Sequence, residues 1–174
     1  MLRADIKKQG NPGGHSIISK TADVSPDIRI VYQITSPSSN LAEFVEKSIL
    51  DLAVSSIRAK ESFFSDFSFV LEKLNKHLRE FSREYSTEGL SVFLSGLVGD
   101  ELYFSILGRS TVYFVKHDQV MNIAQGMDTD GTEFSYVSSG AVGPGNTVFI
   151  SNIDLLDHLS EDDLVDVSRI YANR

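Results

Sequence analysis

Two helices in the first half of the chain are predicted from the three- and four-residue spacing of apolar side chains. The first is expected over about residues 41–59, where Asn40 followed by Glu43 has the spacing of an N-terminal capping pair. The second is expected over about 67–85 and is the most regular element of the chain. Its apolar stripe consists of Phe67, Val70, Leu71, Leu74, Leu78, Phe81 and Tyr85. Because the opposite face is charged, we expect Leu71, Leu74, Leu78 and Phe81 to be buried.

Short apolar runs on both sides of these helices predict β-strands. Two runs precede the helices, Ser16–Ser19 and Asp27–Ile34. From Gly89 onward the period changes to two, and strands are expected at 90–98, 101–107, 111–116, 120–124 and 147–151. Ser160, with Asp162 and Asp163 behind it, is expected to cap a last helix that reaches Val167 or beyond. This order favours an α+β fold with a largely antiparallel sheet and helices on one or both of its faces.

Composition narrows the class of protein. With 174 residues, of which 41% are hydrophobic and 23% charged, residues 1–174 are expected to form a single domain. The formal net charge of -8 argues against nucleic acid or an anionic lipid surface as a partner. The chain has no cysteine, so disulfides, thiol catalysis and thiolate metal sites are excluded. No stretch is long and apolar enough for a membrane span, and we expect a cytoplasmic protein.

Two segments resemble type-2C (PPM-type) metal-dependent serine/threonine protein phosphatases. Leu90–Lys116 resembles the central hairpins of that family, with Gly108-Arg109-Ser110-Thr111 at the place of a Gly-Asp-Ser-Arg element. Ser139–Ser160 resembles the family's small-residue turn, the strand after it, a Ser-Asp-Gly-Leu-x-Asp element and a helix cap. The similarity covers about 90–164, and upstream only the order of elements agrees. The resemblance implies an α-β-β-α sandwich of two stacked, mainly antiparallel sheets, and a centre of two manganese or magnesium ions.

The positions that would hold these metals depart from the family pattern. Gln33 or a neighbour stands where the family has an aspartate at the end of a strand, and Asn152 replaces the aspartate of Ser-Asp-Gly. Asp154 and Asp157 lie close by and would supply carboxylates if the loop shifts its register. The family also continues with a helix, an Asp-Asn metal element and a strand, whereas this sequence stops at Arg174. Either the domain is abbreviated or the sequence is part of a longer protein.

Other constellations have ordinary explanations. Asp128–Glu133 has alternate carboxylates and a glycine but lacks the remaining ligands of a calcium loop, so a polar loop is expected. The four histidines have no metal-ligand spacing, and no Gly-x-Ser-x-Gly element indicates a serine hydrolase. Four phenylalanines occur in seven residues, Phe63, Phe64, Phe67 and Phe69, and they cannot all face the core. We expect one or two of them to mark a partner surface.

Three hypotheses about function follow. The leading one is a catalytically inactive phosphatase-like domain, a pseudophosphatase, that acts as an interaction or regulatory module with a protein partner and needs no cofactor. The second is an active phosphatase that uses Asp154 or Asp157 in a shifted manganese or magnesium site. The third is a structural subunit unrelated to phosphate chemistry, because fold does not fix function. The oligomeric state stays open.

Overall fold

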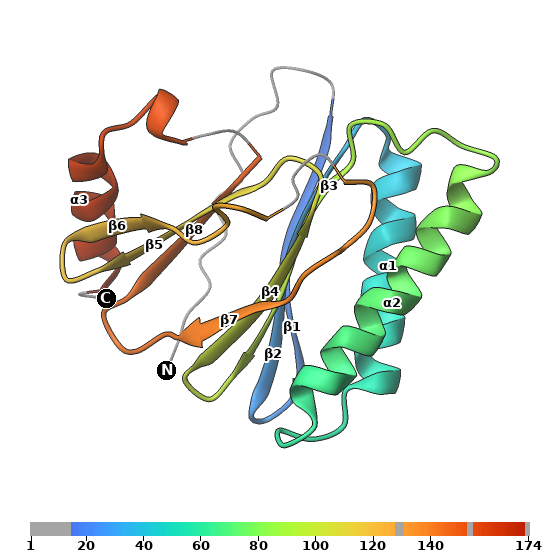
Figure 1. Cartoon of the computed structure of the whole chain (residues 1–174), viewed down its shortest axis with the longest axis horizontal. Helices are drawn as coiled ribbons and strands as arrows, with labels where there is room; N and C mark the ends of the chain where they lie inside the picture. Colours follow the sequence, from blue (N-terminus) through green and yellow to red (C-terminus); the bar gives the residue numbers. More distant parts are fainter. Residues whose placement is uncertain (1–14, 128–130, 153–154, 173–174) are drawn as a thin grey trace.

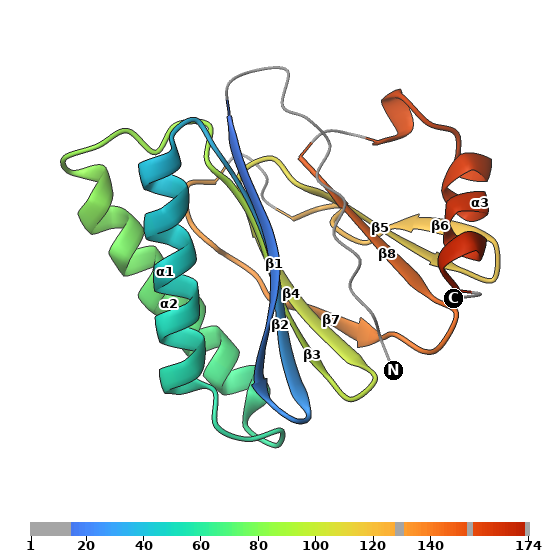
Figure 2. The same cartoon turned by 180° about the vertical axis from the view of Figure 1, so that it is seen from behind.

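Two antiparallel β-sheets are stacked face to face between helices in the computed structural model, which describes residues 15–127, 131–152 and 155–172 (Figure 1). The five-stranded sheet has the order β1-β2-β3-β4-β7 and the three-stranded sheet the order β6-β5-β8. Helices α1 and α2 lie side by side on the outer face of the larger sheet, and α3 lies on the outer face of the smaller one (Figures 1 and 2). The predicted α-β-β-α arrangement is confirmed.

The elements follow one another in an order that separates the two sheets along the chain. They are β1 (Ser16–Ser25), β2 (Ile28–Ser36), α1 (Ser39–Ser56), α2 (Phe63–Ser82), β3 (Ser91–Val98), β4 (Glu101–Leu107), β5 (Thr111–Lys116), β6 (Gln119–Asn122), β7 (Ser138–Ala141), β8 (Thr147–Ser151), the short 3-10 helix η1 (Leu155–Asp157) and α3 (Glu161–Ala172). The chain leaves the large sheet after β4 and returns to it once, as β7. The strand β7 was not predicted, because its sequence Ser-Ser-Gly-Ala has no apolar alternation and its formation depends on pairing with β4.

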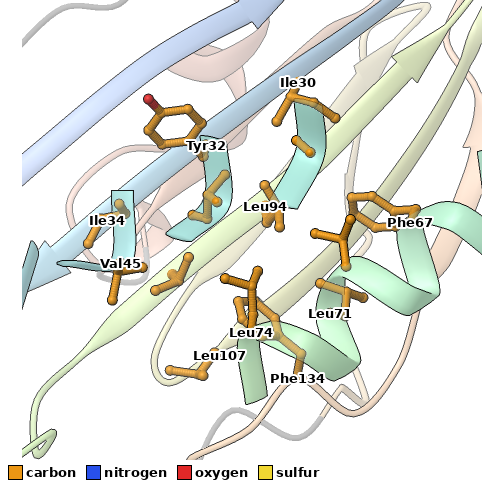
Figure 3. Close-up of a cluster of buried hydrophobic side chains, with 14 of the residues drawn as sticks. Ile30, Tyr32, Ile34, Val45, Phe67, Leu71, Leu74, Leu94, Leu107 and Phe134 are labelled. Carbon is orange, nitrogen blue, oxygen red and sulfur yellow. The ribbon is translucent and has the colours of Figure 1, made fainter. Parts of the chain in front are cut away.

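The largest core fills the space between the two long helices and the large sheet. Ile30, Tyr32 and Ile34 of β2 point toward the helices because they alternate along the strand (Figure 3). The predicted stripe of α2 meets them: Leu71, Leu74 and Leu78 are buried. Phe81 is half-buried and packs its ring against Phe44 of α1 at a centroid distance of 4.6 Å. The periodicity of α2 therefore predicted which face is buried, except at its last turn.

Two smaller cores complete the layers. Between the sheets lie Phe93, Phe104, Ile106, Val112 and Val142, with the rings of Phe93 and Phe104 stacked at 5.8 Å. Between the small sheet and α3 lie Tyr113, Val115, Leu164 and Val165. Strands β3, β4 and β5 thus bury both faces, which is why they are close to continuously apolar.

The starts of α1 and α2 differ from the predictions and that of α3 agrees; α2 begins at Phe63 instead of about Phe67. Ser38, not Asn40, caps α1, since its Oγ accepts a hydrogen bond from the backbone N–H of Leu41 at 3.2 Å and the helix already begins at Ser39. Ser160 caps α3 as predicted: its Oγ accepts from the N–H of Asp163 at 3.2 Å, and the Asp163 carboxylate accepts from the N–H of Ser160 at 2.8 Å. Among the described residues, no helix has the length and apolar character that crossing a membrane requires.

Candidate functional site

A cleft of about 800 Å³ opens where the first residues of β1 and β3, the end of β2 and the β4–β5 turn come together. The C-terminal turns of α2 close one side, and residues 131–133 and Asn152, which follows β8, close the other. Strand residues of the large sheet therefore line this cleft, and the small sheet borders it through Asn152, which directly follows β8. Its lining is mixed, with hydroxyl, amide and charged groups beside the apolar side chains of Ile17, Leu78, Leu90 and Leu107.

Thr35 lies near the end of β2 on the lining of the cleft. Its neighbours across the sheet are Ile17 on β1 and Ser91 on β3. The residue is only 5% exposed, and within the described part of the chain its Oγ1 has no hydrogen-bond partner. A buried hydroxyl without a partner costs free energy in a folded protein, so such atoms often mark places where another group binds.

The β4–β5 turn is held against the start of β3 by short polar contacts. The Oγ of Ser91 donates to the carbonyl oxygen of Arg109 at 2.5 Å and lies 2.8 Å from the Oγ of Ser110. Gly108 has a φ of 68°, and a Cβ atom there would overlap the carbonyl oxygen of Leu90. The turn therefore needs glycine at 108, and it presents the exposed side chain of Arg109 at the cleft.

Residues 131–134 are fastened to α2 at the other side of the cleft. Arg79 forms an ion pair with Glu133 at 2.7 Å. One turn earlier on α2, the buried side-chain amide of Asn75 makes two hydrogen bonds to the backbone of Phe134, donating to its carbonyl at 2.9 Å and accepting from its N–H at 2.8 Å. Helix α2 thus fixes the segment that borders the cleft.

Solved structures of protein phosphatases share this arrangement of layers. A serine/threonine phosphatase of S. agalactiae matches 94% of this chain and 83% of its own length with a TM-score of 0.62 at 12% identity. PppA, described as a key regulatory component of T6SS in Pseudomonas aeruginosa, matches 86% of this chain and 76% of its own with a TM-score of 0.60 at 16% identity.

The chain has a type-2C phosphatase-like fold. The catalytic domain of the serine/threonine phosphatase PstP in complex with two manganese ions also matches it, over 87% of this chain and 82% of its own, with a TM-score of 0.55 at 11% identity. No protein-family model matches the sequence, and a search of curated proteins gives no match. At these identities the likeness shows the fold alone.

The phosphatase-like domain brings together only some of the residues singled out in the sequence. Asn152 and Arg109 both line the cleft. Gln33 lies further back in β2, opposite Phe93, and is not part of the lining, whereas Thr35, two residues along the strand, is. Asp157 ends η1 as an exposed residue away from the cleft lining, and Asp154 lies outside the described residues. Sequence reasoning missed Thr35, because only the pairing of β2 with its neighbours shows which side chain reaches the cleft.

The described residues of the phosphatase-like domain do not fit a pair of divalent cations. In the described ranges, no group of three or more histidine, aspartate or glutamate side chains is arranged to hold a metal. The carboxylates that the described residues bring to the cleft are those of Glu88 and Glu133, and Glu133 is already paired with Arg79. The side chains of Thr35 and Asn152 bring a hydroxyl and a neutral amide to the cleft, and these are poor ligands for hard cations without charged partners.

Proposed function

We propose that this chain is a phosphatase-like domain without metal-dependent hydrolysis that acts as an interaction or regulatory module. The observation that carries the proposal is the chemistry of the cleft. Thr35, near the end of β2, and Asn152, after β8, line the cleft, and Asn152 stands where the family resemblance calls for an aspartate. Neither side chain carries charge, so neither offsets the charge of a cation.

Charge balance supports the same conclusion. Two divalent cations bring four positive charges into a small volume, and several carboxylates must converge to hold them. Among the described residues, the charged side chains that line the cleft are those of Arg79, Arg109, Glu88 and Glu133, whose formal charges cancel, two positive against two negative. Arg109 also stands where the Gly-Asp-Ser-Arg element has its aspartate, which reverses the charge at that position. A cleft of this kind favours a polar or zwitterionic group over a binuclear metal centre.

A role in regulation is in keeping with the proteins that share the fold. PppA is described as a key regulatory component of T6SS, and it covers 86% of this chain. A domain that keeps three well-packed cores, and whose described residues form no cluster of metal-ligating side chains, retains a stable surface for contacts with other proteins. We infer that the partner is a protein and that no metal cofactor takes part.

Thermal unfolding with and without metal tests the proposal. A ligand present at 100 times its Kd stabilises the folded state by about 2.7 kcal/mol, and at about 2–4 °C per kcal/mol this raises Tm by about 5–10 °C. We expect no such rise for the full chain in millimolar manganese or magnesium, and no turnover of an aryl phosphate or a phosphorylated peptide. The variant Asn152→Asp restores one carboxylate at nearly constant size, and its Tm should respond to manganese more than that of the parent.

The opposite result has a specific form. A metal-dependent rise in Tm of the unmodified chain, together with turnover that disappears in Asp154→Ala or Asp157→Ala, would establish an active phosphatase with a shifted site. Turnover that survives both substitutions would place the metal on other residues and would equally contradict the proposal.

A further inference from the structure

A second hollow of about 440 Å³ lies between α2 and the segment 134–137, apart from the cleft. We call it the α2 groove. Its lining consists of Phe64, Ser68, Leu71, Glu72, Asn75, Phe134, Ser135, Tyr136 and Val137. Leu71 and Phe134 are buried and form its floor, and both belong to the core beneath α2 (Figure 3). No residue of the α2 groove lines the cleft.

Large aromatic side chains stand exposed at this groove. Phe64 on α2 is 56% exposed and Tyr136 on the facing segment is 62% exposed, and both line the groove; Phe69, 44% exposed on the same helix, does not line it. Phe63 and Phe67 point into the core, as the sequence led us to expect for part of this cluster. Single exposed aromatic residues are common, but two that line the same hollow above a buried apolar floor are typical of protein interfaces.

Both walls of the α2 groove are fixed before any partner arrives. Asn75 holds the backbone of Phe134 with two hydrogen bonds, and the Oγ of Ser105 on β4 donates to the carbonyl of Tyr136 at 2.6 Å. The exposed segment 134–137 is therefore tied both to α2 and to the large sheet. A rigid hollow loses little conformational entropy when a partner binds, which favours affinity.

The same hydrogen bonds indicate which kind of segment fits. An added β-strand needs backbone groups with which to pair, yet the N–H and carbonyl of Phe134 and the carbonyl of Tyr136 are engaged by side chains. A helix satisfies its own backbone hydrogen bonds and offers side chains at three- and four-residue spacing. The α2 groove thus suits a helix better than an extended strand.

Charge indicates the character of that helix. Among the described residues that line the α2 groove, Glu72 alone is charged. The two lysines nearest along α2 have contacts of their own: Lys73 lies 4.9 Å from the centre of the Phe69 ring, and Lys76 lies 3.9 Å from Glu80. Glu72 has no ion-pair partner within the described part of the chain, and the chain as a whole has a net charge of -8. A basic residue on the incoming helix would complement it.

We propose that the α2 groove binds an amphipathic helix of a partner protein, with apolar side chains set between Phe64 and Tyr136 and a lysine or arginine paired with Glu72. This inference rests on the proposed function in treating the domain as an interaction module. It does not depend on the cleft or on metals, so the metal experiments above leave it untouched.

A display library of helix-forming peptides, selected against the full chain, tests the proposal. We expect the selected peptides to share apolar positions at helical spacing and one basic position. Fluorescence polarisation of the best peptide should then show a Kd weakened about tenfold or more by Phe64→Ser or Tyr136→Ser. Val54→Ser is the matched control, because Val54 is 70% exposed on α1 and does not line the α2 groove; it should leave Kd unchanged. Glu72→Lys should reverse the preference, so that an acidic residue replaces the basic one in the best peptide.

Other outcomes would overturn the assignment. Selected peptides whose binding is insensitive to both aromatic substitutions, or a consensus that is acidic for the unmodified chain, would contradict it. Concentration-dependent dimerisation in sedimentation that is lost in Phe64→Ser would assign the surface to a second copy of this chain instead. A metal-inert domain with no helix binding at this surface would refute this inference and leave the proposal about hydrolysis standing. If the domain binds the helix and also hydrolyses phosphate, the proposal about hydrolysis is wrong and this inference stands.

Discussion

The ring of Phe63, at the start of α2, rests on the bare backbone of Gly96 in the middle of β3, where a Cβ atom would overlap the ring. Phe63 is 1% exposed, and its ring also stacks on Phe67 at 5.5 Å and contacts Tyr103 at 5.1 Å. The missing side chain of Gly96 therefore sets how closely the first turn of α2 approaches the large sheet. That approach positions the whole helix, including the residues that border the cleft and the α2 groove.

Replacing Gly96 by alanine should therefore destabilise the domain. Because the ring is enclosed by other aromatic groups, we expect a loss of about 1–3 kcal/mol in the free energy of unfolding, measured in urea. Gly140→Ala on β7 is the matched control, since a Cβ atom there meets nothing within 4 Å. If the two substitutions cost the same, the contact between Phe63 and Gly96 does not position α2.

Leu74 offers a test of the core beneath α2. It is 1% exposed and lies in the centre of the predicted stripe. Truncation to alanine should cost about 2–5 kcal/mol, through lost burial and the cavity left behind. Val54→Ala on α1, at an exposed position, should stay within about 0.5 kcal/mol of the parent. A loss below about 0.5 kcal/mol at Leu74 as well would place the stripe at a surface.

Asn75 should matter more than the ion pair one turn further along α2. In Asn75→Ala the backbone N–H and carbonyl of Phe134 lose their partners in a buried place, which should cost about 1–3 kcal/mol. Arg79→Ala removes an ion pair whose side chains are 54% and 43% exposed, and should cost about 0–1 kcal/mol. Hydrogen exchange provides a local measurement: the amide of Phe134 should lose protection in the Asn75 variant and keep it in the Arg79 variant. The reverse order of protection would show that the ion pair, not the amide, holds this segment.

The cap of α3 predicts a defined pH dependence. Hydrogen bonds from the hydroxyl and the backbone N–H of Ser160 lower the pKa of Asp163 below its ordinary value of 3.8. Because the folded pKa lies below the unfolded one, this contribution to stability is fully present above the ordinary value and is lost as pH falls through the lower, folded pKa. In Ser160→Ala the pKa of Asp163 should move up toward 3.8, as measured by carboxyl chemical shifts in an NMR titration. An unchanged titration would show that the Ser160 hydroxyl does not hold the carboxylate in solution.

The local sequence determined the features that depend on residues a few positions apart in the chain. The stripe of α2 predicted its buried face because helical spacing alone brings Leu71, Leu74 and Leu78 to one side. Ser160 and Asp163 predicted the start of α3, since a capping pair acts within four residues. At α1 the sequence offered several polar residues in a row, and only the backbone direction after β2 decided that Ser38 is the cap.

Only the tertiary structure decided what depends on pairing between distant strands. The strand β7 exists because β4 offers it an edge, and Thr35, not Gln33, lies on the cleft because of where β2 meets β1 and β3. The exposure of Phe64 beside Tyr136, 72 positions later in the chain, likewise follows from the path of residues 131–137 along α2, which Asn75 fixes. Side-chain periodicity shows which residues share a face of one element. Long-range contacts then determine which faces, edges and loops meet. The local pattern of residues does not specify the partners in these contacts.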